Sequence, residues 1–233
     1  MAQKSLSFQQ YRAADLTIFA VILCAFEGLI GVAANKWFPE QPFVVSLIYA
    51  IVTLVFMRWG AFGVIHAVWG GITYALANGG DAKQYVIYAV GNAFVAFTIF
   101  YVHFVGKERI RKNAWLTIVH VGLTYLSITV GRTLAGLIFD RDIIGLFLAF
   151  AGPDALSAVL GLVIVLICRR QNGLYEDQKL YLTRTQEQRM KELRQSTVEE
   201  EDIYQRYPFL KKPDSEQRQE EINADSGEQE NKQ

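Results

Sequence analysis

Six apolar runs fill most of the first 170 residues, and this feature restricts the chain to few architectures. Most of the runs reach the roughly 20 residues that a helix needs to cross the hydrocarbon core of a bilayer. An open strand in lipid would leave backbone groups unpaired, so we assign every run to a helix. The runs cover residues 14–36, 42–58, 60–78, 85–106, 114–139 and 143–168. The sequence therefore predicts an all-α, polytopic membrane protein with a six-transmembrane-helix bundle over residues 1–170.

Charged residues are distributed unevenly along the chain. Residues 1–168 contain 11 Lys or Arg and 8 Asp or Glu, whereas the last 65 residues contain 12 and 15. Residues 171–233 are therefore predicted to form a charged cytoplasmic tail that is helical in part. Its end, which is rich in Glu, Gln, Asp and Asn, is predicted to be disordered.

Basic residues near the ends of the runs indicate the orientation of the bundle. If the N-terminus is inside, nine Lys or Arg residues fall in cytoplasmic segments and three in outer links. The nine are Lys4, Arg12, Arg58, Lys107, Arg109, Arg111, Lys112, Arg169 and Arg170, and the three are Lys36, Lys83 and Arg141. This excess follows the positive-inside rule. We therefore expect a multi-pass protein of the cell membrane with both termini in the cytoplasm.

Three charged residues lie deep inside apolar runs. A charge at the bilayer centre costs about 2.5–3.5 kcal/mol on insertion scales, so such residues usually face the bundle interior and contact one another or a ligand. Glu27 and Arg132 fall in the outer half of the predicted membrane, and Asp154 falls near its middle. Their shared depth predicts a substrate site that opens outward.

Helical spacing adds further polar side chains to this layer. Tyr125, Thr129 and Arg132 follow one another at intervals of four and three residues, so they share a helix face. Tyr88 and Asn92 are four residues apart on run four. The outer link between runs one and two supplies an amide and an aromatic ring that could close over a ligand. The candidate substrate-binding residues are Glu27, Asn35, Trp37, Tyr88, Asn92, Tyr125, Thr129, Arg132 and Asp154.

Gly152 and Pro153 directly precede Asp154 in run six. Proline removes a helical hydrogen bond, so we expect a break in this helix that presents N–H groups to an anionic group. A plain kink at Pro153 is the alternative.

Simpler roles remain open for several of these residues. Arg132 either contacts a ligand or forms an internal salt bridge with Glu27 or Asp154, and both can occur. Asn92 either contacts a ligand or forms a hydrogen bond between helices. Trp37 either closes over a ligand or belongs to an interfacial aromatic belt.

The sequence offers no catalytic chemistry. It contains no nucleophile motif and no phosphate-binding loop, and Cys24 and Cys168 lack the spacing of a zinc site. His66, His103 and His120 fall on three different helices, where we expect packing or interfacial roles. We expect no enzymatic activity, no cofactor and no bound metal. The net charge of zero gives no indication of a nucleic-acid partner.

Small residues recur at every fourth position in two runs. Gly63, Ala67 and Gly71 do so in run three, and Ala20 and Cys24 do so in run one. Such faces let helices approach closely. Inside a bundle they serve internal packing, whereas on an outward face they form a docking site for another membrane protein.

Two neighbouring segments resemble a known family. The segment FMRWGAFGVIHAVWGGITYAL (56–76) follows the helix YRAADLTIFAVILCAFEGLI (11–30). Together they resemble the substrate-binding S components of energy-coupling factor (ECF) transporters, in which a glycine-rich turn and a small-residue helix follow the second helix. The six-helix topology, the cytoplasmic termini and the size of the membrane part are also similar, and the resemblance covers residues 10–170.

The resemblance implies a protein that captures a vitamin-like small molecule from outside the cell. It also implies association with a transmembrane T component and two ATP-binding subunits, which supply the energy. Members of this family meet the T component through their first three helices, often by an AxxxA pattern on the first. The corresponding positions here are Ala20 and Cys24, an imperfect match, and the long charged tail departs from the family.

Two other functions remain open. The buried carboxylates could relay protons in a secondary carrier or channel that works alone, although six helices with no evident repeat are few for a carrier. The tail could instead make the chain a membrane scaffold that recruits cytoplasmic proteins.

Overall fold

The computed structural model describes residues 7–37, 45–171 and 173–185, and isolated positions as far as residue 195. Within these residues every regular element is a helix, which confirms the all-α prediction. The chain divides into two compact units, Met1–Tyr181 and Leu182–Gln233, so the first unit extends past the predicted boundary at residue 170. The described residues of the second unit are helical. The end of the tail, for which we predict disorder, lies outside the described residues.

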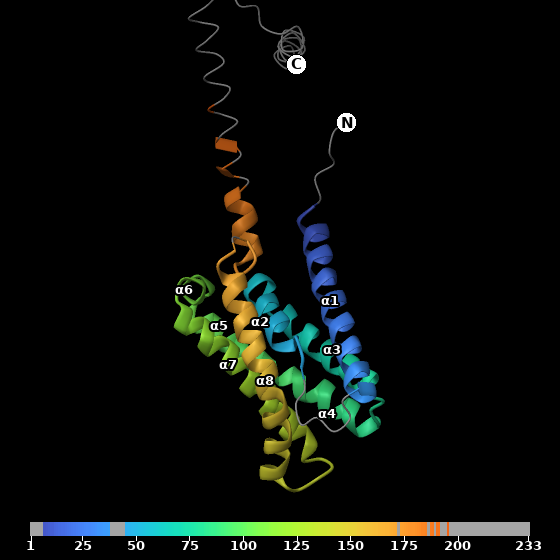
Figure 1. Ribbon diagram of the computed structural model, residues 1–233. Helices are drawn as coiled ribbons and strands as arrows, with labels where there is room; N and C mark the ends of the chain where they lie inside the picture. Colours follow the sequence, from blue (N-terminus) through green and yellow to red (C-terminus); the bar gives the residue numbers. More distant parts are fainter. Residues whose placement is uncertain are drawn as a thin grey trace, which may run out of the picture. The chain divides into compact units, whose positions relative to one another are not determined.

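The first unit contains the helices shown in Figure 1. They are α1 (Phe8–Trp37), α2 (Ile48–Trp59), α3 (Phe62–Ala77), α4 (Ala82–Ala93), the 3₁₀ helix η1 (Phe94–Phe97), α5 (Thr98–Val105), α6 (Lys107–Lys112), α7 (Ala114–Gly136) and α8 (Ile143–Arg169). The fourth apolar run is divided between α4, η1 and α5, which follow one another without a gap.

Among the described residues, four helical stretches are long and apolar enough to cross a membrane. They are Phe8–Ala33, Ala82–Val105, Ala114–Gly136 and Ile143–Arg169. The helices α2 and α3 are apolar but shorter, with 12 and 16 residues. At a rise of 1.5 Å per residue, α2 is about 18 Å long, well short of a hydrocarbon core of about 30 Å. The structure thus supports a membrane protein with four helices of spanning length, fewer than the six predicted.

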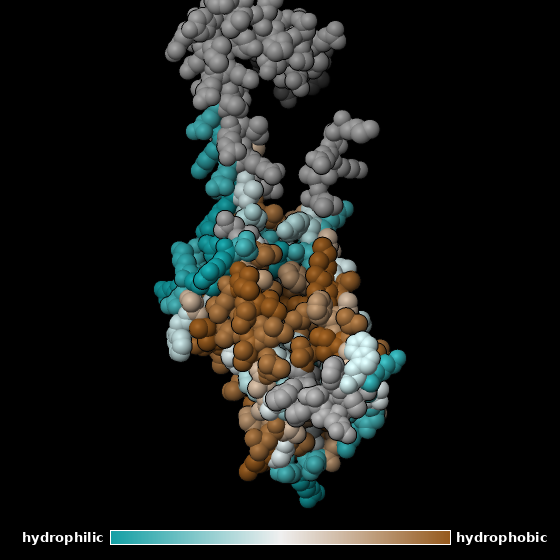
Figure 2. All heavy atoms as spheres, viewed as in Figure 1, coloured by the Kyte–Doolittle hydropathy of each residue, from teal (hydrophilic) through white to brown (hydrophobic). Residues whose placement is uncertain are grey.

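Hydrophobic side chains form a band over α1 and α8 in Figure 2, between hydrophilic ends. On α1, more than half of the surface of Ile18, Val21 and Leu29 is exposed. A soluble protein rarely exposes apolar surface on this scale, whereas a bilayer would cover it with lipid.

The two ends of the first unit differ in charge. The end that we call the basic end holds Arg58 at the end of α2, the cationic helix α6, and Arg169 at the end of α8. The opposite end contains the links that carry Lys83 and Arg141. This distribution gives the first unit one strongly basic end.

The short helix α2 lies at the centre of the bundle. Its residues 48–58 are all buried, and apart from Thr53 and Arg58 they are apolar or aromatic on every face, as expected of an enclosed helix. Tyr49, Val52 and Phe56 pack there in one cluster with Leu23 of α1 and Ile128 of α7. Enclosure by the longer helices explains how a helix too short to span alone stays inside the apolar band.

The stripe of small residues on α3 is buried, as in the alternative of internal packing. A Cβ atom added at Gly63 would lie 2.6 Å from Cδ2 of Phe56 on α2. One added at Gly71 would lie 2.6 Å from the carbonyl oxygen of Tyr88 on α4. Ala67 between them is fully buried. These positions therefore let α2 and α4 approach α3 and are not themselves exposed.

The corresponding residues of α1 are half-buried. Cys24 faces α3, because the hydroxyl of Thr73 donates to its Sγ atom at 3.3 Å. Ala20 lies one helical turn earlier and is partly exposed. The α1 pair is therefore only partly available to a partner.

The sixth apolar run forms one continuous helix. Pro153 lies inside α8, which runs from Ile143 to Arg169 without interruption. The predicted break before Asp154 is therefore wrong, which leaves the alternative of a plain kink at Pro153. Neighbouring groups can compensate for a proline in an apolar helix.

Candidate functional site

Arg132 of α7 is the centre of a buried polar network. Its side chain is only 6% exposed and forms a salt bridge through Nη1 to Asp154 of α8, which is 9% exposed. Its Nε–H donates to Oδ1 of Asn92 on α4 at 2.8 Å. The guanidinium carbon also lies 4.6 Å from the centre of the Tyr88 ring, a cation–π contact. Every polar edge of this side chain thus meets a neighbouring helix.

The partners of Arg132 are held in place by further helices. The amide of Asn92 donates to the backbone oxygen of Ala67 on α3 at 2.8 Å. The hydroxyl of Tyr49 on α2 donates to Oδ2 of Asp154 at 2.7 Å. The network therefore joins α2, α3, α4, α7 and α8. A network in which each buried polar group is satisfied fixes the relative positions of the helices that supply it.

Glycine allows α4 and α7 to cross closely enough for this contact. A Cβ atom added at Gly91 would lie 2.6 Å from the Cα atom of Arg132. A Cβ atom added at Gly131 would also collide with α4, at the backbone oxygen of Gly91. Because Asn92 and Arg132 directly follow these two glycines, the close crossing places their side chains side by side. The 3₁₀ turn η1 begins two residues after Asn92.

Glu27 of α1 belongs to a neighbouring set of hydrogen bonds. Its Oε1 accepts from Ser46 Oγ at 2.6 Å and from the Leu47 N–H at 3.0 Å. The Ser46 N–H in turn donates to Oγ of Ser157 on α8 at 3.0 Å. A carboxylate at this position interacts favourably with the N-terminus of α2. Among the ion pairs of the described residues, Arg132 is matched with Asp154 and not with Glu27.

Tyr125 and Thr129 lie on the same face of α7 as Arg132. The Tyr125 hydroxyl donates to the backbone oxygen of Ala151 on α8 at 2.7 Å, and its ring packs edge-on against Tyr49 with centres 5.6 Å apart. Thr129 is fully buried, and its Oγ1 has no hydrogen-bond partner among the described residues. Tyr125 therefore attaches α7 to α8 beside the network, and Thr129 lines the same interior face.

Of the two candidates from the outer link, Trp37 can be placed, and it lies apart from the network. Trp37 is 71% exposed at the end of α1. The side chain of Asn35 and the residues 38–44 lie outside the described part of the chain. An exposed Trp at a helix end is typical of an interfacial position. Of the nine candidates, Arg132 and five others therefore form one group, and Glu27 lies next to it.

Sequence reasoning missed two members of the site. Tyr49 is fully buried at the start of α2, and the available signal was a hydroxyl inside an otherwise apolar run. Ser157 follows Asp154 by three residues, so it shares the same helix face.

The network is internally neutral and fully paired. Breaking a buried ion pair by removing one partner typically costs about 3–5 kcal/mol, because the remaining charge stays in an apolar environment. A polar solute can therefore enter only by exchanging its own charges for those of Arg132 and Asp154. A solute with both an anionic and a cationic group would satisfy both residues at once.

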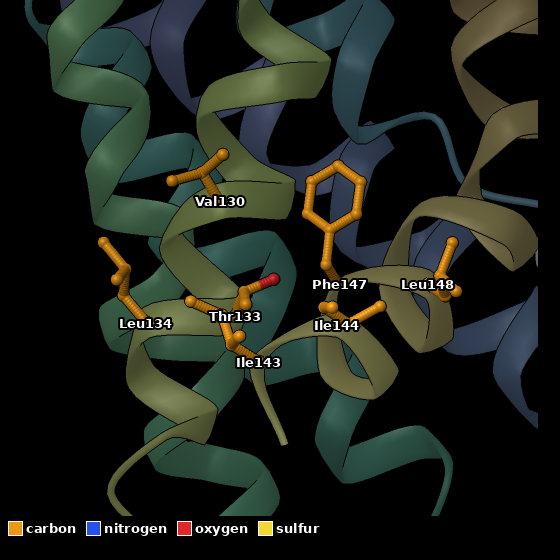
Figure 3. Close-up of a pocket in the computed structure, with 7 residues that line it drawn as sticks. All are labelled: Val130, Thr133, Leu134, Ile143, Ile144, Phe147 and Leu148. Carbon is orange, nitrogen blue, oxygen red and sulfur yellow. The ribbon is translucent and has the colours of Figure 1, made fainter. Parts of the chain in front are cut away.

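A separate pocket of about 360 Å³ lies between α7 and α8, near the end of the first unit that is opposite the basic end (Figure 3). Its lining consists of Val130, Thr133, Leu134, Ile143, Ile144, Phe147 and Leu148. The only hydroxyl among them, that of Thr133, donates to the backbone oxygen of Thr129 at 2.9 Å. This pocket suits a hydrocarbon chain, and no member of the polar network lines it.

Comparison of the chain with protein-family models, curated proteins and solved structures finds no match. The resemblance to S components therefore remains a prediction from the sequence.

Proposed function

We propose that this chain is a membrane-embedded substrate-capture subunit of an ECF-type importer for a vitamin-like small molecule. The observation that carries the proposal is the network of Arg132, Asp154 and Asn92, which five helices build inside an apolar bundle. Charged residues in a membrane interior are expensive and mark ligand pathways more often than packing. The ligand we expect is small and carries both charge signs.

The orientation of the bundle follows from the basic end. Cytoplasmic segments carry an excess of Lys and Arg, so the basic end lies in the cytoplasm of a cell-membrane protein. The network then lies in the outer half, because Tyr49 is near the end of α2 opposite Arg58 and Asn92 lies in the first half of the span Ala82–Val105, which ends beside α6. A ligand would reach it from outside.

Energy and delivery would come from partners. In an ECF-type assembly these are a transmembrane T component and ATP-binding subunits. The surfaces available to the T component are the exposed apolar face of α3, formed by Ile65, Trp69 and Leu76, and the exposed apolar face of α1 next to Ala20 and Cys24. Ile18, Val21 and Leu29 form the face of α1.

The direct test is to purify the full chain in mild detergent and identify any bound small molecule by mass spectrometry. The affinity of that molecule is then measured for Arg132→Ala and for a matched control, Arg141→Ala, in an exposed link. We expect Arg132→Ala to weaken binding by at least about tenfold, a loss of 1.4 kcal/mol or more, and the control to bind normally.

Three results would contradict the proposal or part of it. Absence of both a ligand and ATP-binding partners from the native preparation would remove the basis for substrate capture. Ion-gradient-driven uptake by liposomes that contain only this chain would instead establish a carrier that works alone. Equal affinity of Arg132→Ala and the native chain would make the ion pair purely structural.

A further inference from the structure

A short segment after α8 folds back onto the basic end of the bundle. Residues 173–178 follow α8, and Gly173 has a φ of +80°, a conformation that glycine adopts without strain. The Gly173 N–H donates to Oε1 of Glu176 at 2.6 Å, which closes the turn. The turn directs Tyr175 into the bundle instead of letting the chain continue away from it.

Tyr175 anchors this segment in the apolar core. It is 1% exposed and packs in a cluster with Met57 of α2, Ile110 of α6 and Val121 of α7. Its hydroxyl lies 3.3 Å from Nδ1 of the fully buried His120 on α7. Burial raises the pKa of Tyr175, so its phenol stays neutral in this position. One aromatic side chain thus fills the space between three helices.

Two ion pairs hold the acidic residues of the segment against α6. Lys107 Nζ lies 2.6 Å from Oδ2 of Asp177, and Arg111 Nη1 lies 2.9 Å from Oε2 of Glu176. All four side chains retain contact with solvent, with exposed fractions of 14% to 33%. Water can replace these pairs at small cost, so they are suited to reversible contact.

The segment also covers the ion pair that joins α1 to α2. Arg58 is bound to both oxygens of Asp15, at 2.7 and 2.9 Å. Its Nη1 donates in addition to the backbone oxygens of Gly173 and of Leu174, the latter at 3.2 Å. Through Arg58 the segment contacts α1 and α2, as it contacts α6 and α7 through Tyr175.

We propose that residues 173–178 form a latch that closes the basic end of the bundle and must detach before that end can open. The latch consists of one buried aromatic anchor and two solvent-accessible ion pairs, so it can leave while the helices stay folded. The role of the latch in delivery rests on the proposed function: a closed latch would keep a captured solute from leaking into the cytoplasm. The helix that begins at the latch leads into the polar tail, which could pull it away.

The test measures access to the space beneath the latch. Ile110 is fully buried under it and provides a reporter as Ile110→Cys, in a full chain whose native cysteines are replaced by Cys24→Ala and Cys168→Ala. The protein is placed in lipid nanodiscs, where both ends are accessible, and the rate of modification by a charged maleimide is recorded. No ligand or partner is needed, so the result does not depend on the success of the substrate-capture test.

We expect slow modification with the latch intact and at least about tenfold faster modification in Lys107→Gln/Arg111→Gln, which lacks both ion pairs. The matched control is Lys112→Gln, which removes a charge from the same helix but whose partner is Glu108 and not the latch. Lys107→Glu alone should also speed modification. Combining it with Asp177→Lys reverses the ion pair and should restore the slow rate of modification.

Several outcomes would overturn the proposal. Fast modification with the latch intact would show that the basic end is already open. A rate unchanged by Lys107→Gln/Arg111→Gln, or raised equally by Lys112→Gln, would exclude a role for the two ion pairs. If Ile110→Cys disturbs folding, hydrogen exchange of residues 173–178 in the otherwise native chain gives the same answer. Exchange as fast as that of an unstructured segment would exclude a docked latch.

Discussion

Arg132 and Lys107 each pair with an aspartate, but the two pairs lie in very different surroundings. The Arg132–Asp154 pair is 6% and 9% exposed in the bundle interior, whereas the Lys107–Asp177 pair is 25% and 33% exposed at the basic end. Loss of one partner leaves an unsolvated charge in the first case, whereas water replaces the partner in the second. The same chemistry therefore fixes the helices at one place and permits reversible contact at the other.

The strongest test of this difference between the two ion pairs is to remove one charge from the interior pair. Asp154→Ala should lower the free energy of unfolding by about 3–5 kcal/mol, because Arg132 stays buried without a counter-ion. The measurement is unfolding of the protein in mixed micelles on titration with sodium dodecyl sulfate.

A paired replacement separates the structural role of the ion pair from its role in binding. Arg132→Met combined with Asp154→Leu removes both charges, so stability should recover most of the loss while ligand binding stays abolished. A double variant as unstable as Asp154→Ala would mean that the network is needed for folding beyond its charge balance.

The next effect concerns the close crossing of α4 and α7. Gly91→Ala places a methyl group 2.6 Å from the Cα atom of Arg132, so the helices must separate. We expect a loss of about 1–3 kcal/mol in the free energy of unfolding, as for other overpacked sites. Gly122→Ala is the matched control, since nothing lies within 4 Å of its added Cβ atom. Equal losses in the free energy of unfolding for the two substitutions would contradict the close crossing of α4 and α7.

The next prediction compares the hydrogen-bond acceptors of two tyrosines in the same layer. Tyr49→Phe removes a hydrogen bond to the carboxylate of Asp154 and should cost about 1.5–3 kcal/mol, whereas Tyr125→Phe removes one to a backbone oxygen and should cost about 1 kcal/mol. Unfolding titrations of both variants give the difference. A larger loss for Tyr125→Phe would show that Asp154 draws little stability from Tyr49.

The smallest effect belongs to the basic end. Lys107→Gln should change the free energy of unfolding by less than about 1 kcal/mol, and the change should shrink as salt is added. Lys112→Gln should change it even less, because its pair with Glu108 is 69% and 41% exposed. A salt-independent loss of several kcal/mol for Lys107→Gln would place this pair in the same class as the interior one.

Much of the architecture was predictable from the sequence because apolar periodicity and length are local properties. The helices α1 to α5, α7 and α8 overlap the six apolar runs, and Gly60 ends α2 with a φ of +65° between runs two and three. The lengths of α2 and α3 were not predictable, because run two begins before α2 does. Ser46 and Leu47, hydrogen-bonded to Glu27, form the irregular start that shortens α2.

The site was predictable in its residue types, but not in its pairings. Helical spacing placed Arg132 on an interior face together with Tyr125 and Thr129. It did not show that Asp154, and not Glu27, is the partner of Arg132. It also left open whether the small residues of α3 face inward or outward, because spacing alone does not distinguish the two.

The sequence by itself determined that the chain forms apolar helices, and that the charges within them must turn inward, since lipid does not solvate them. Only the tertiary structure decided which helices meet at Arg132 and where the segment after α8 goes. Both depend on contacts between residues far apart in the chain, such as Gly91 with Arg132 and His120 with Tyr175. Such contacts are fixed by the shapes of packed side chains, which a linear pattern of residue types does not specify.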